Sequence, residues 1–170
     1  MTTLRGNAFV YGANIDTDQI YPAPLLTITD ADKVSKHAME GVDPDFVKEC
    51  QPGDMIVAGT NFGCGSSREH AAVTLKAAGV SAVIAASFGR IFFRNAINLG
   101  LPVLVCKELH TRVKRGDRLS LDPASGHILN ESTGEQFQAE PLSGYVLEII
   151  RHGGIKPMMR ELLGKGSQPA

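Results

Sequence analysis

The chain has 170 residues, of which 43% are hydrophobic and 21% charged, and its formal net charge is −1. These values fit one globular domain, 1–170, with a hydrophobic core of its own. They argue against nucleic acid or an anionic membrane as the main partner. The longest apolar runs are too short to span a bilayer, and the N-terminus, MTTLRGNAFV, lacks the apolar region of a signal peptide, so a cytoplasmic protein is expected.

The N-terminal part alternates between regular structure and a polar loop. The predicted elements, in order, are a strand at 4–10, a loop at 11–27, a helix at 29–41 and one or two helical turns at 44–50. The loop holds Gly, Asn, two Asp and two Pro, which interrupt regular structure. Thr29 or Asp30 can cap the helix, and Gly41 can end it.

The middle of the chain has the alternation typical of a parallel sheet. The predicted elements are strands at 53–59, 81–87 and 102–106 and helices at 67–80 and 90–100. The strands are short apolar runs, and the second helix ends at Gly100. In the first helix, Ser66 or Ser67 can be the N-cap, and Glu69 completes a capping box with Ser66. A β-α-β-α-β order predicts an α/β fold with a mostly parallel sheet.

The C-terminal part changes character. Residues 117–141 combine alternating apolar residues with Pro and Gly turns, which predicts short antiparallel strands. Residues 143–164 indicate a helix, a Gly-Gly break and a second helix, and the tail from about 165 to 170 is expected to be disordered. Nothing in the composition resembles a linker between two domains.

The cysteines do not predict a metal site. Cys50, Cys64 and Cys106 are widely spaced and form no Cys-x-x-Cys pattern. In a reducing compartment they are expected to be free thiols.

The stretch NFGCGSSREHA, residues 61–71, carries the strongest sign of chemistry. A glycine-rich turn that leads into a helix N-terminus leaves backbone N–H groups free for an anion. Ser66 and Ser67 add hydroxyl groups, and Arg68 adds a forked donor that suits a carboxylate or phosphate. Such a site can bind a small anion, and it can also stabilise a deprotonated serine.

Simpler interpretations compete with this one. Ser-x-x-Glu before an apolar run is most often only a capping box, and the stretch matches neither a P-loop nor a nucleophile elbow. A helix N-terminus can lower the pKa of a nearby thiol, but Cys64 is more consistent with a small filler residue. His70 is expected to have a packing or hydrogen-bonding role.

A second polar stretch, NIDTDQIYP (14–22), places Asp16 and Asp18 two residues apart in a loop. Taken alone, this pattern is that of an Asx-turn or a weak cation site. Two polar clusters beside an apolar sheet, however, predict one pocket at the carboxyl ends of the strands.

Two segments resemble a known family. YGANIDTDQIYPA (11–23) and GTNFGCGSSREHAAVTLKAAGVSAVIAASFGRIFFRNAINLGLPVL (59–104), with the total length, resemble the small subunits of 3-isopropylmalate dehydratases, in the aconitase superfamily. The resemblance covers roughly residues 4–165. It implies the swivelling β/β/α domain of aconitase as a free-standing chain. It also implies a large partner subunit that holds a [4Fe-4S] cluster through its own cysteines, with no cofactor on this chain, and a small hydroxy-dicarboxylate substrate.

The resemblance also implies roles for single residues. Ser66, the first serine of the Ser-Ser-Arg run, matches the family's catalytic base. Arg68 matches a substrate-carboxylate ligand, with Ser67 and Gly65 beside it in the same turn. Asp18 matches an acidic residue that orients groups of the site, including a histidine of the partner. Asp16 has no such match and is expected to be structural.

Substrate specificity is expected to come from the loop that follows Asp18. No Lys or Arg lies between Tyr21 and Asp32, and Leu25 and Leu26 offer an apolar wall. A buried carboxylate without a partner is costly, so this loop favours an alkyl group such as isopropyl. Pro24 departs from the bulkier residue usual in the family, which leaves dimethylmalate, citraconate, citramalate or homoaconitate types of dehydratase open. A stand-alone carboxylate-binding module is the alternative of another class.

Overall fold

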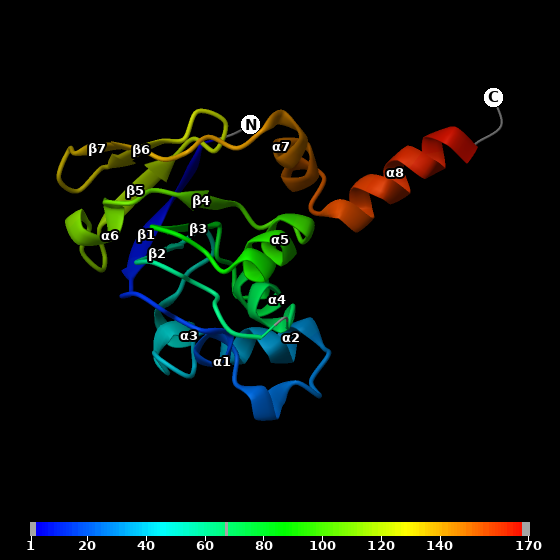
Figure 1. The fold of residues 1–170 in the computed structure, drawn as a ribbon, viewed down its shortest axis with the longest axis horizontal. Helices are drawn as coiled ribbons and strands as arrows, with labels where there is room; N and C mark the ends of the chain where they lie inside the picture. Colours follow the sequence, from blue (N-terminus) through cyan, green and yellow to red (C-terminus); the bar gives the residue numbers. More distant parts are fainter. Residues whose placement is uncertain (1–2, 67, 168–170) are drawn as a thin grey trace.

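A computed structural model describes residues 3–66 and 68–167, with side chains through residue 164 (Figure 1). Seven strands form one sheet in the order β4-β3-β2-β1-β5-β6-β7. Their bounds are Leu4–Val10 (β1), Met55–Ala58 (β2), Ala82–Ala85 (β3), Val103–Val105 (β4), Arg118–Leu121 (β5), His127–Asn130 (β6) and Gln136–Gln138 (β7). β1 to β4 pair in parallel, and β5 to β7 are antiparallel to their neighbours.

Strand β1 joins the two halves of the sheet. Its first residues, 4–7, pair with β5, and its last residues, 8–10, pair with β2. The parallel half is buried on both faces: Ile56 and Val83 lie in one apolar cluster, and Met55 and Ile84 lie in another. Burial on both faces explains why these strands are continuous apolar runs in the sequence.

Ten helical segments surround the sheet within the described part of the chain. They are Thr17–Ile20 (α1), Ala23–Leu25 (η1), Ala31–Val34 (α2), Ser35–His37 (η2), Phe46–Glu49 (α3), His70–Ala77 (α4), Arg90–Asn98 (α5), Leu109–Arg112 (α6), Gly144–Arg151 (α7) and Ile155–Ser167 (α8). In Figure 1 the short N-terminal helices gather below α4, opposite β5–β7, and α8 extends away from the body. None of the helices described is long and apolar enough to cross a membrane.

Most of the predicted architecture is confirmed. The strands, the β-α-β-α-β order, the antiparallel strands within 117–141 and the two C-terminal helices are all present. Gly153 and Gly154 have positive φ and separate α7 from α8, as the Gly-Gly break predicted. The predicted loop at 11–27 contains two short helical turns, α1 and η1. α8 continues through Ser167, so the prediction of a disordered tail from about 165 is wrong at 165–167, and 168–170 lie outside the described residues.

The predicted helix at 29–41 is wrong in its extent. Asp30 does cap it, through a side-chain bond from the Asp32 N–H, but α2 ends at Val34 and only a short 3₁₀ turn follows. The chain instead turns back onto α1, where the Gly41 N–H donates to the Gln19 carbonyl over 3.0 Å. A Cβ atom on Gly41 would lie 2.6 Å from the Gln19 Cα. The glycine is therefore present for close approach and not as a helix end.

The predicted start of the helix at 67–80 is also wrong. α4 begins at His70 with Glu69 as N-cap and no described side-chain cap, so the Ser66–Glu69 capping box does not form. A complete capping box lies in the other polar loop, between Asp16 and Gln19. Upstream of α4, backbone bonds hold Gly63 and Cys64 against the 15–17 loop.

Candidate functional site

Two loops that follow neighbouring parallel strands lie side by side. The Gly63 N–H donates to the Ile15 carbonyl over 2.7 Å, and the Thr17 N–H donates to the Cys64 carbonyl over 2.9 Å. Asn14 and Asn61, both at positive φ, also join their side chains. The carboxyl ends of β1 and β2 therefore bring the two polar stretches of the sequence into one site, as predicted.

Ser66 lies where these loops meet. Its Oγ is 3.2 Å from the Oγ1 of Thr17, and either hydroxyl can donate. Thr17 is 4% exposed and Ser66 is exposed. The buried Thr17 hydroxyl therefore holds the solvent-facing Ser66 hydroxyl through a hydrogen bond. Gly65 allows this approach, because it has a φ of +107° and a Cβ there would lie 3.2 Å from the Thr17 Oγ1.

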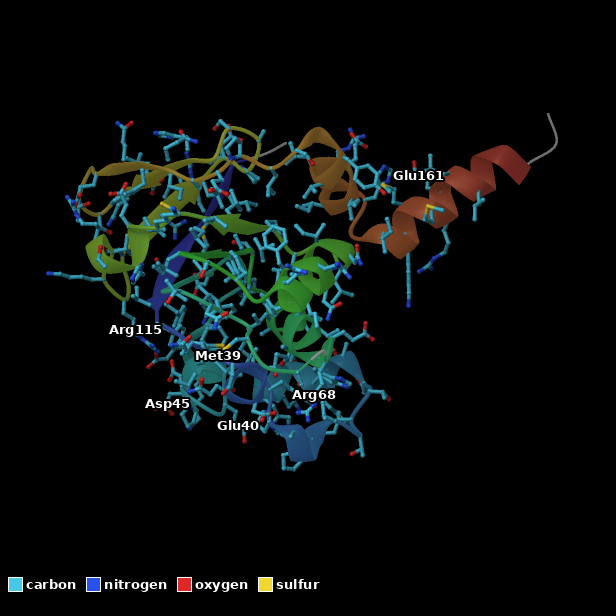
Figure 2. All side chains as sticks on the ribbon, in the orientation of Figure 1. Met39, Glu40, Asp45, Arg68, Arg115 and Glu161 are labelled. Carbon is cyan, nitrogen blue, oxygen red and sulfur yellow. The ribbon has the colours of Figure 1, made fainter. Side chains whose placement is uncertain are left out.

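Arg68 and Asp18 form the charged part of the site. The Arg68 Nη1 donates to the Asp18 Oδ1 over 2.7 Å, and Figure 2 shows Arg68 on the side of the short N-terminal helices. Asp18 is the second residue of α1, whose capping box fixes its backbone. A guanidinium has five N–H donors, so this ion pair orients Arg68 and leaves most of its donors for another anion.

A pocket of about 310 Å³ opens beside Ser66. Its lining residues come from the second loop and from the start of α5: Gly63, Cys64, Gly65, Ser66, Gly89, Arg90 and Ile91. Gly89 is needed there because a Cβ would lie 2.8 Å from the Gly63 carbonyl oxygen. Ile91 is 43% exposed, which is high for a large apolar residue. The pocket thus combines the Ser66 hydroxyl, the Arg90 guanidinium and the apolar surface of Ile91.

The predicted specificity residues lie on a separate segment. Leu25 is the last residue of η1 and Leu26 is its C-cap, and both are half-buried. The hydroxyl of the buried Tyr21 donates to the Leu25 carbonyl over 2.7 Å, and the Tyr21 ring stacks on His70 at 5.5 Å. His70 therefore packs, as expected. Neither Leu25 nor Leu26 is among the described residues that line the Ser66 pocket.

Two residues of this candidate site, Thr17 and Arg90, were not predicted from the sequence. Thr17 was overlooked because its hydroxyl matters only through a contact 49 residues away. Arg90 follows β3, the third parallel strand. Its position at the carboxyl end of a strand could have marked it as a site residue. Ser67, predicted to bind substrate, lies outside the described residues.

The described residues do not fit an iron–sulfur cluster on this chain. No three His, Cys, Asp or Glu side chains gather there in a way that could hold a metal ion. Burial raises the pKa of Cys50 to about 11 and also raises the pKa of Cys106. These shifts oppose the thiolate form that a metal needs.

Comparison with known proteins shows the family of the chain. The aconitase C-terminal domain family matches residues 26–108. A 3-isopropylmalate dehydratase small subunit from Pyrobaculum neutrophilum is 53% identical over 89% of this chain and 93% of its own length. Small subunit 1 of the same enzyme from Methanopyrus kandleri is 47% identical over 92% of both chains. The chain belongs to the family of 3-isopropylmalate dehydratase small subunits.

Two further members extend the likeness. The crystal structure of 3-isopropylmalate dehydratase from Methanocaldococcus jannaschii matches with a TM-score of 0.91 and 38% identity, covering 98% of this chain and 100% of that one. An isopropylmalate/citramalate isomerase small subunit from the same organism is 46% identical over 95% of this chain and 96% of its own length. The predicted aconitase-type fold is thereby confirmed, and a family of small subunits implies a large-subunit partner.

Proposed function

We propose that this chain is the small subunit of a hydro-lyase that isomerises 2-isopropylmalate and 3-isopropylmalate by dehydration and rehydration in leucine biosynthesis. Family membership over almost the whole chain supports this function. The observation that carries it within the chain is the pair of contacts across the two loops, Ser66 with Thr17 and Arg68 with Asp18.

Ser66 acts as the base in this proposal. It takes the proton from the carbon next to a substrate carboxylate, and the bonding electrons move toward that carboxylate. A serine hydroxyl is a weak acid, so its alkoxide needs hydrogen-bond donors and nearby positive charge. The Thr17 hydroxyl can donate to the Ser66 Oγ, and Arg68 contributes positive charge in the same site.

Arg68 binds a substrate carboxylate, and Asp18 holds Arg68 in place. A guanidinium matches a carboxylate with two parallel N–H bonds. Because Asp18 occupies one Nη1 bond, the substrate meets an arginine whose orientation is already restricted. Gly65, which precedes Ser66, completes the proposed binding surface together with Ser67, the next residue in the sequence.

The large subunit completes the enzyme in this proposal. When bound to that subunit, a [4Fe-4S] cluster would supply Lewis-acid chemistry for the leaving hydroxyl group. This chain provides the base, the carboxylate ligand and the specificity loop. Ser66 and Asp18 are exposed in the isolated chain, and a partner that covers them would exclude water from the reaction.

The alkyl end of the substrate is assigned to Leu25 and Leu26. The relative from Methanocaldococcus jannaschii, named for both isopropylmalate and citramalate, makes citramalate a second candidate substrate. Citramalate carries a methyl group in place of isopropyl. Because each buried CH₂ contributes about 0.8 kcal/mol, a loop fitted to isopropyl should discriminate measurably between the two.

The test is reconstitution. The chain is mixed anaerobically with a cluster-loaded large subunit, and formation of the unsaturated intermediate is followed with 2-isopropylmalate, 3-isopropylmalate and citramalate. Turnover is expected only with both subunits, with isopropylmalate preferred. Failure to assemble with the large subunit, together with carboxylate binding by this chain alone, would favour a stand-alone binding module.

A further inference from the structure

The pocket beside Ser66 contains a cation that the proposed mechanism has not used. We propose that Arg90 binds the second carboxylate of the substrate, opposite the one held by Arg68; this inference rests on the proposed function. Arg90 is the first residue of α5 and lines the same pocket of about 310 Å³ as Ser66. That volume is within the range of small-molecule sites.

Arg90 has no partner among the described residues, which is the first reason for this inference. Its side chain is exposed, and the described residues offer it no hydrogen bond and no ion pair. Arg68, in contrast, is paired with Asp18 at 2.7 Å. Of the described residues that line the pocket, Arg90 is the only charged one. An unpaired guanidinium beside a proposed base is available for an anionic ligand.

Charge balance is the second argument. The proposed substrate is a dicarboxylate, and the Asp18 carboxylate already offsets part of the charge of Arg68. One paired arginine therefore cannot neutralise two substrate carboxylates. Arg90 adds a full positive charge to the pocket, and its planar fork suits a carboxylate.

The position of α4 is the third argument. The sequence suggested that the N-terminus of this helix supports the Ser66 alkoxide, but α4 starts only at His70. The positive charge that stabilises the Ser66 alkoxide, before it takes the proton from carbon, must therefore come from side chains such as Arg68 and Arg90. As electron density shifts onto the neighbouring carboxylate, a guanidinium on the same pocket stabilises that charge.

The experiment compares Arg90→Gln, Arg90→Lys and Arg94→Gln in the reconstituted complex. Arg94 is a matched control: it lies one turn later on α5, is exposed, has no described ion pair and does not line the pocket. For each variant, kcat and KM for 3-isopropylmalate are measured, and the affinity for the large subunit is measured separately.

We expect Arg90→Gln to lower kcat/KM by about 10- to 100-fold, the usual effect of losing a charged hydrogen bond. Arg90→Lys should recover part of this loss, Arg94→Gln should match wild type, and subunit affinity should not change. Unchanged kinetics in Arg90→Gln would overturn the inference. Weaker subunit association with wild-type kinetics at saturation would also overturn it and make Arg90 an interface residue. A wild-type complex without turnover would overturn the proposed function, and this inference with it.

Discussion

Ser66 can affect the protein through chemistry or through stability, and the structure separates the two. Its hydroxyl contacts Thr17 and does not cap α4, so its removal should cost at most about 1 kcal/mol of unfolding free energy. Loss of a general base, in contrast, lowers kcat by about 10²- to 10⁴-fold. We therefore predict that Ser66→Ala abolishes most turnover of the complex with little change in thermal unfolding. A well-assembled variant with near-normal kcat would move the base elsewhere, first to Ser67.

Arg68 should not tolerate lysine. A lysine ammonium keeps the charge and can still pair with Asp18, but it cannot hold a carboxylate with two parallel bonds. Arg68→Lys should therefore raise KM and lower kcat in steady-state assays of the complex. Arg112→Lys is the matched control, because Arg112 is also a partly exposed arginine paired with a carboxylate, Glu135, at 2.6 Å. Equal kinetics for both variants would show that Arg68 is only a surface charge.

Among the elements, α1 depends on Gly41, which lies 22 residues after Gln19 in the sequence. The Gly41 Cα lies so close to α1 that an added Cβ would be 2.6 Å from the Gln19 Cα and 2.8 Å from the Asp18 carbonyl oxygen. Both neighbours are backbone, so the strain cannot be relieved by rotating a side chain. Gly41→Ala should displace α1 and weaken the Asp18–Arg68 pair.

The expected result for Gly41→Ala is a loss of activity together with a destabilisation of about 1–3 kcal/mol. Gly12→Ala is the control, since a Cβ at Gly12 meets no atom within 4 Å and its loop also leads into α1. Unfolding curves and kcat/KM of both variants provide the measurement. If Gly41→Ala behaves like Gly12→Ala, close packing of this turn does not position Asp18.

The η1 segment gives the prediction on substrate choice. Introducing arginine at Leu26 adds a partner for a carboxylate in a stretch that has no Lys or Arg between Tyr21 and Asp32. Leu26→Arg should weaken 3-isopropylmalate, whose alkyl group gains about 1.5–3 kcal/mol from burial, and improve a tricarboxylate such as homoaconitate or isocitrate. The measurement is the ratio of kcat/KM for the two substrates, with Leu25→Arg as the second position and Leu162→Arg on the exposed face of α8 as the charge control. An unchanged ratio at both loop positions would remove η1 from specificity.

The same elements show what the sequence could and could not predict. Strands buried on both faces, such as β2 and β3, are continuous apolar runs and were predicted closely. The end of α2 was not, because the chain after it turns back so that the Gly41 N–H bonds to the Gln19 carbonyl. α4 also begins at His70, three residues later than predicted. The pattern of Gly, Ser, Arg and Asp residues singled out Ser66, Arg68 and Asp18, and the family resemblance supplied their roles, whereas Thr17 and Arg90 needed the fold.

At the scale of the whole molecule, one polar network joins segments far apart in sequence. Arg115 donates to Asp43 at 2.9 Å and to Glu49 at 2.7 Å, and its guanidinium lies 4.7 Å from the ring centroid of Phe9. The Tyr11 hydroxyl donates to the same Asp43 carboxylate at 2.7 Å. The network therefore links the end of β1, the segment around α3 and the turn before β5. In Figure 2 the labels of Arg115 and of Asp45, the N-cap of α3, both lie on the left of the molecule.

The network makes a prediction about acid stability. Burial alone would raise the pKa of Asp43, but hydrogen bonds from Tyr11 and Arg115, with the charge of Arg115, lower it below its usual 3.8. Because the folded pKa is the lower one, ionised Asp43 stabilises the fold above about pH 4, and this contribution disappears as the pH falls through the folded pKa. Asp43→Asn should cost about 1–2 kcal/mol at pH 7, a value reduced for the partial exposure of Arg115.

Urea unfolding of wild type and Asp43→Asn at pH 7, 5, 4 and 3 is the measurement. The difference between them should stay constant from pH 7 to pH 5 and shrink below pH 4. The pKa values of Asp117 and Asp122 are also lowered, by hydrogen bonds from Lys114 and Asn130 in the first case and chiefly from Ser125 in the second. Both proteins should therefore lose stability in acid, and only the difference between them reports on Asp43. A difference that does not change with pH would mean that Asp43 stabilises the fold through hydrogen bonds that do not depend on its charge.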